Sequence, residues 1–182
     1  WNLQLQKIMS FNINHSISVK GKSKLKWHLP GLKTQYAGAV MLDGQEYVVY
    51  PQKSFGFTDC LWGKDFPSPW MHLAGCNLVS QISGKRLMQS AFASCGFFSG
   101  KNNKKIMVCF NHEGEEFTFN NKGFSKKNAV SFVYTENDGI AHWTVSAQNK
   151  KALVDIELYA EKNEMLAMNY ENPLGQKKYN EL

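Results

Sequence analysis

Asp59 is the residue whose surroundings most favour acid chemistry. It comes shortly before a stretch with very little charge, because residues 66–100 contain only two charged side chains. A carboxylic acid among apolar neighbours keeps its proton, since burial disfavours the charged form. Asp59 is therefore the candidate proton donor. His72 could relay the proton or orient the acid.

Three aromatic residues follow Asp59 at short spacing, namely Trp62, Phe66 and Trp70. Their ring faces could stabilise a cation that forms on a bound molecule. Each polar candidate also has a structural interpretation. Asp59 could cap the following turn. His72 could be a hydrogen-bonded core histidine, and Trp62 could close the end of a barrel.

Other catalytic motifs are missing from the sequence. It has no G-x-S-x-G elbow, no phosphate-binding loop and no H-E-x-x-H zinc motif. His112, Glu113, Glu115 and Glu116 are of the types that bind metals, but they fall on a predicted surface hairpin. We therefore expect no metal site and no cofactor.

Turn signals recur between short apolar runs and predict β-hairpins. No segment repeats apolar residues at helical spacing over three turns. We therefore predict an all-β protein with little helix, built from ten to twelve short antiparallel strands in a sandwich or barrel. The predicted turns are Asp43-Gly44, Ser83-Gly84-Lys85, His112-Glu113-Gly114, Asn137-Asp138-Gly139 and Asn149-Lys150-Lys151.

The charge-poor stretch predicts a buried hairpin. If its centre is Gly84-Lys85, then Cys76 pairs with Ala93, and Cys95 lies on the same face. These three small residues could line an apolar ligand site. Alternatively, they make room for large side chains of a second sheet. The face is expected to carry Trp70, His72, Ala74, Cys76 and Leu78 opposite Phe97, Cys95, Ala93 and Ala91.

Length and composition indicate one globular domain over residues 1–182. Hydrophobic residues make up 43% of the chain and charged residues 20%. The net charge is +6, but Arg86 is the only arginine, so specific nucleic-acid binding is not expected. The lysines form either a solvated rim or a contact with an anionic partner such as a membrane surface.

Two further features concern the environment of the chain. Its four cysteines, at positions 60, 76, 95 and 109, are too far apart for a C-x-x-C motif. We expect free thiols and a cytoplasmic location, where thiols stay reduced. The chain starts at Trp1 without a methionine, which suggests a piece of a longer protein.

The segment Gly56–Trp70 resembles the tocopherol cyclase family, and in particular its bacterial, firmicute-type members. The resemblance is carried by an acidic residue, a Trp-Gly pair, a Phe-Pro pair and a strand-opening tryptophan. Weaker similarity extends over most of the chain, including 31–36, 76–78, 83–85 and 169–173. The matching residues are Asp59, Trp62-Gly63, Phe66-Pro67 and Trp70.

This resemblance implies a lipocalin-like β-barrel, the second half of a two-barrel protein distantly related to carotenoid hydratase-type proteins. Its ligand would be a prenyl quinol or a similar isoprenoid. The implied isomerase reaction is cyclisation, in which an acid protonates a prenyl double bond and a phenol oxygen captures the cation. The alternatives are a non-catalytic carrier or sensor of an apolar molecule, and an interaction domain with a filled barrel.

Overall fold

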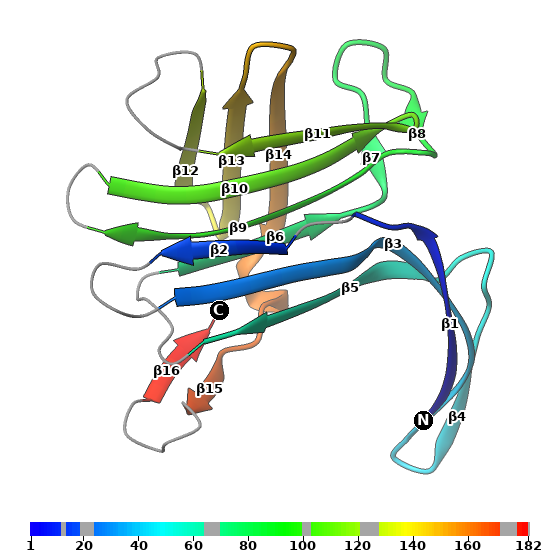
Figure 1. Ribbon diagram of the computed structural model, residues 1–182. Helices are drawn as coiled ribbons and strands as arrows, with labels where there is room; N and C mark the ends of the chain where they lie inside the picture. Colours follow the sequence, from blue (N-terminus) through cyan, green and yellow to red (C-terminus); the bar gives the residue numbers. More distant parts are fainter. Residues whose placement is uncertain are drawn as a thin grey trace.

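The structure is a computed structural model that describes residues 1–11, 14–18, 24–63, 70–99, 103–120, 128–171 and 178–181 (Figure 1). The prediction of an antiparallel all-β chain is confirmed, and the only helical element in these ranges is the short 3₁₀ turn η1 (Lys162–Glu164). The first sheet contains β1 (Asn2–Met9), β2 (Asn14–Ser18), β3 (Lys24–Leu42), β4 (Gln45–Val49) and β5 (Phe55–Trp62).

Two more sheets and two short ribbons complete the described strands. The central sheet has the order β11-β10-β9-β6, and the third sheet has the order β12-β13-β14. The central strands are β6 (Trp70–Gly75), β9 (Ala91–Ser99), β10 (Asn103–His112) and β11 (Glu115–Asn120). The third sheet holds β12 (Ala129–Asn137), β13 (Ile140–Gln148) and β14 (Leu153–Glu161). The ribbons pair β7 (Leu78–Val79) with β8 (Arg86–Leu87), and β15 (Met168–Glu171) with β16 (Lys178–Glu181).

The three tightest hairpin turns contain the predicted turn residues. Asp43, Glu113 and Asp138 take positive φ angles, and each is followed by a glycine with positive φ. Two successive residues of this kind match the twist of the flanking strands. The turn at Asn149 is also where it was predicted, and the Asn149 side chain accepts hydrogen bonds from the backbone N–H groups of Lys151 and Ala152.

The central sheet is covered on both faces, so the described sheets stack in three layers (Figure 1). One face packs on the first sheet and the other on the third sheet, whose strands cross the central strands steeply. A sheet buried on both sides needs apolar residues at successive positions. This explains why residues 70–99 contain so few charges. The first core includes Trp27, Leu29, Leu32, Ala93, Cys95, Phe97 and Cys109, and the second includes Phe92, Val108, Phe119, Phe132 and Val145.

The predicted barrel is not confirmed, because the described strands form separate sheets that do not close on themselves. The described ranges contain sixteen strands rather than ten to twelve, in part because β7 and β8 pair as a separate two-residue ribbon. Within the same ranges, no helix is long and apolar enough to cross a membrane.

The register of the central hairpin differs from the prediction by two residues. Ala74 pairs with Ala93, and His72 pairs with Cys95. The difference arises in the connection between β6 and β9, where β7 and β8 pair with each other. A shift of two residues leaves the side chains of β6 and β9 on their predicted faces, whereas a shift of one would have reversed them. The prediction is wrong for Leu78, which lies on β7 and packs in the second core rather than with Trp70 and Cys76 in the first.

Strand β3 changes the face that it buries. His28 pairs with Cys60, Gly31 with Thr58 and Thr34 with Gly56. From each of these pairs to the next, β3 advances three residues while β5 advances two. Such bulges bend a strand and redirect its side chains. The first half of β3 packs on the central sheet, and its second half extends away from the stack with β1 and β4 (Figure 1).

Gly38 is required where β1, β3 and β4 meet. It pairs with both Leu3 and Val49, and its φ is +137°. A Cβ atom there would lie 2.1 Å from the backbone oxygen of Asn2. We predict that Gly38→Ala lowers the free energy of unfolding by about 2–4 kcal/mol, measured by urea denaturation.

Gly44→Ala is the matched control for this variant. Gly44 also has positive φ, but a Cβ atom there meets nothing within 4 Å. We expect a loss of about 1 kcal/mol from backbone strain alone. Equal losses for the two variants would contradict the close strand approach at Gly38.

Candidate functional site

Alternation along β5 decides which of its residues face the central sheet. Leu61 packs in the first core, so Phe57 and Asp59, at two-residue steps, share its face. Trp62 has the opposite parity and pairs with the exposed Lys26 on the outer side. The structure therefore separates Trp62 from Asp59, although the sequence suggested one site for both.

Asp59 contacts two residues from other strands. The ring N–H of Trp27 on β3 donates a hydrogen bond to Asp59 Oδ2, with a distance of 2.8 Å. His72 Nε2 on β6 lies 3.0 Å from the same oxygen. Nε2 is buried and has no regular hydrogen bond among the described residues, so the contact is an ion pair when the imidazole is protonated. Asp59 and His72 thus join the first sheet to the central sheet.

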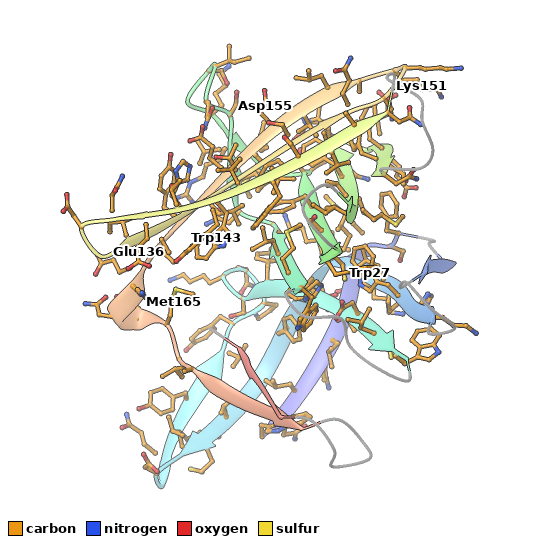
Figure 2. All side chains as sticks on the ribbon, turned by 90° about the vertical axis from the view of Figure 1, so that its left-hand side faces the viewer. Trp27, Glu136, Trp143, Lys151, Asp155 and Met165 are labelled. Atoms are coloured by element: carbon orange, nitrogen blue, oxygen red, sulfur yellow. The ribbon has the colours of Figure 1, made fainter. Side chains whose placement is uncertain are left out.

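Three aromatic rings surround the imidazole of His72. Phe57 meets it edge-on with a centroid distance of 5.3 Å, and Trp27 does so at 6.1 Å. Trp70 lies nearly parallel to it at 6.3 Å. We call Trp27, Phe57, Asp59, Trp70 and His72 the His72 site. In Figure 2, Trp27 lies where β3 meets the green strands of the central sheet, whereas Trp143 belongs to the third sheet.

The His72 site is open to solvent on one side. Phe57 faces the central sheet, yet it is 37% exposed. The side chains of His72 and Asp59 keep 22% and 18% exposure, while Trp27 is fully buried. The site is therefore closed at Trp27 and accessible to solvent at Phe57. A ligand could reach His72 and Asp59 from that side without entering the core.

The protonation of Asp59 differs from the expectation. Burial raises the pKa of its carboxyl group, but the polar contacts with His72 and Trp27 and the charge of His72 outweigh it, so the pKa falls below the ordinary value. The carboxylate is therefore ionised at neutral pH. The predicted role of Asp59 as a protonated acid therefore lacks support in this geometry.

The small residues of the central sheet serve packing. Ala93 and Cys95 are fully buried against the large side chains of β3, and Cys76 packs at the edge of the same core. This favours the interpretation in which small residues accommodate a second sheet. The four thiols are free, as predicted. Burial raises the pKa of Cys76 and raises that of Cys95 to about 12, with a further rise at Cys95 from the charge of Asp59. Cys95 is thus no nucleophile.

The structure brings together some of the predicted residues. Asp59, His72 and Trp70 meet, whereas Trp62 lies outside the site and Phe66 lies outside the described residues. Trp27 and Phe57 were missed. The alternation Phe57-x-Asp59-x-Leu61 carried the signal for Phe57, because it predicts one shared face.

A second polar cluster contains Ser90, His112 and Glu113. These are the residue types of a hydrolase triad, but the order of their contacts differs from that of a triad. Ser90 Oγ donates to Glu113 Oε1 at 2.9 Å and accepts the backbone N–H of Glu113. His112 Nδ1 lies 3.4 Å from the same Oγ. In a triad the imidazole lies between serine and acid. Here the fully buried serine lies between them and fixes the β10–β11 turn.

Comparison with protein-family models, with curated proteins and with solved structures gives no significant match. The resemblance to tocopherol cyclases therefore stays an expectation from the sequence.

We predict that Asp59→Asn reduces stability in a pH-dependent way. Because the folded-state pKa of Asp59 lies below its ordinary 3.8, the ionised carboxylate stabilises the fold above that value. This contribution is lost as pH falls through the folded-state pKa. Urea denaturation should show the variant about 1–3 kcal/mol less stable than the parent at pH 7. The difference should shrink below about pH 4. A constant difference from pH 7 to pH 3 would contradict the ionised state.

Proposed function

We propose that the chain binds an apolar molecule that carries a hydroxylated ring, such as a prenyl quinol or a related isoprenoid, at the His72 site. The observation behind this is the polar Asp59–His72 pair surrounded by three aromatic rings at an open edge between two sheets. Ligand sites are commonly apolar with a few convergent polar groups. Cofactors and metals have no part in this proposal.

Each part of the site has a task in such binding. The exposed ring of Phe57 offers a face for stacking with an aromatic ring. Both contacts of Asp59 use Oδ2, and no hydrogen bond to Oδ1 occurs among the described residues. Oδ1 is therefore suited to accept the hydrogen bond of a phenolic hydroxyl group. The apolar tail would lie along the seam between β5 and β6.

The charge state of Asp59 favours ligand binding over catalysis. Protonating a prenyl double bond requires a strong acid in dry surroundings. The lowered pKa of Asp59 argues against that role, and leaves His72 as the proton donor of a cyclase-type isomerase. We therefore favour a carrier or sensor over an enzyme. We also propose a lipocalin-like relationship to tocopherol cyclases and a bacterial source. The proposed location is the cytoplasm, with contact to an anionic membrane surface.

The test compares Phe57→Ala with Trp62→Ala. Phe57 faces His72, and Trp62 is a similarly exposed aromatic residue on the other side of the same strand. With a short-chain prenyl quinol in titration calorimetry, we expect Phe57→Ala to bind about tenfold more weakly. Trp62→Ala should bind like the parent. No heat of binding with the parent, or equal losses in both variants, would reject the site and favour a filled interaction domain.

A further inference from the structure

Lys33 is a buried cation of β3 whose ammonium group lies between Phe55 on β5 and the segment that precedes β9. It is only 5% exposed. Its ammonium group donates a hydrogen bond to the backbone oxygen of Met88, with a distance of 2.6 Å, and lies 4.9 Å from the ring centre of Phe55. Among the described residues, no carboxylate forms an ion pair with it. A carbonyl and a ring solvate the charge but do not neutralise it.

A bulge in β3 brings this lysine inside. Gly31 pairs with Thr58 and Thr34 pairs with Gly56, so β3 has one residue more than β5 in this interval. As a result Leu32 and Lys33 are both buried, although neighbours in a regular strand point to opposite faces. Bulges that redirect a side chain are frequent beside functional sites. The bulge places a charge where an apolar residue would otherwise be expected.

The ammonium group lies beside the His72 site. Phe55, under the ammonium, and Phe57, against the imidazole, share one face of β5 two residues apart, which is about 7 Å. Phe55 is 38% exposed, so the open edge extends from Phe57 to Phe55. The positive charge of Lys33 also acts on the Cys76 thiol, where it opposes the effect of burial on the pKa. That thiol stays neutral and supplies no counter-charge.

We propose that Lys33 binds a carboxylate group of the apolar ligand, so that the preferred ligands are amphipathic acids. The proposal rests on the ligand site at His72. The carboxylate would supply the counter-charge that Lys33 lacks, and the apolar body would cover Phe55 and Phe57. A hydroxylated ring at Asp59 and an acid group at Lys33 would then define the two polar ends of the ligand.

The experiment uses a fluorescent polyene acid, cis-parinaric acid, and its methyl ester, which differ only in the charge of the head group. We expect the parent chain to bind the acid about tenfold or more tightly than the ester. In Lys33→Met the two affinities should become equal, because the counter-charge is gone. Lys26→Met is the control, since Lys26 is exposed on the outer side beside Trp62. It should keep the preference for the acid.

The outcomes separate this inference from the ligand site itself. Equal binding of acid and ester by the parent, or an undiminished preference in Lys33→Met, would overturn the role of Lys33 and leave the site intact. Absence of binding for both probes would reject the site as well. Thermal unfolding checks each variant, and Lys33→Gln replaces Lys33→Met if the latter does not fold.

Discussion

The burial of the central sheet on both faces is the constraint on which the rest of the structure depends. Every polar side chain that points into either layer must find a partner there, since an unpaired buried charge is costly. On the side of the first sheet, Asp59 meets His72 and Trp27. These three residues come from β5, β6 and β3, so their contact ties together strands that are separate along the chain.

The same contact explains why a binding site would arise at this place. Trp27 closes the core on one side of the pair, and Phe57 and Phe55 leave it open on the other. The two bulges of β3 lie between His28 and Thr34, and beyond them the strand extends away from the stack with β1 and β4 (Figure 1). Lys33 lies at that transition. The closed core at Trp27, the exposed rings of Phe55 and Phe57, and the buried charge of Lys33 thus all depend on the path of β3.

Local sequence signals predicted the hairpins well and the arrangement of the sheets poorly. Turns such as Asp43-Gly44 and Asp138-Gly139 need positive φ, so residue type alone locates them. The faces of β6 and β9 also followed from alternation, and they survived a register shift of two residues, whereas Leu78 beyond β6 packs in the other core. The position of Asp59 relative to Trp62 could not be predicted from proximity in sequence, since residues three apart in a strand point to opposite faces. Neither the stacking of three sheets nor the bulges at Lys33 had a local signal.

The central claim is that the open edge between β5 and β6 binds an apolar ligand. Photo-crosslinking tests it most directly, with a diazirine-bearing prenyl quinol and peptide mapping by mass spectrometry. We expect label within Phe55–Asp59 and Trp70–Cys76, with competition by the unmodified quinol. Label confined to the third sheet, for example at the half-exposed Tyr134 beside Trp143, or label that the quinol does not displace, would contradict it.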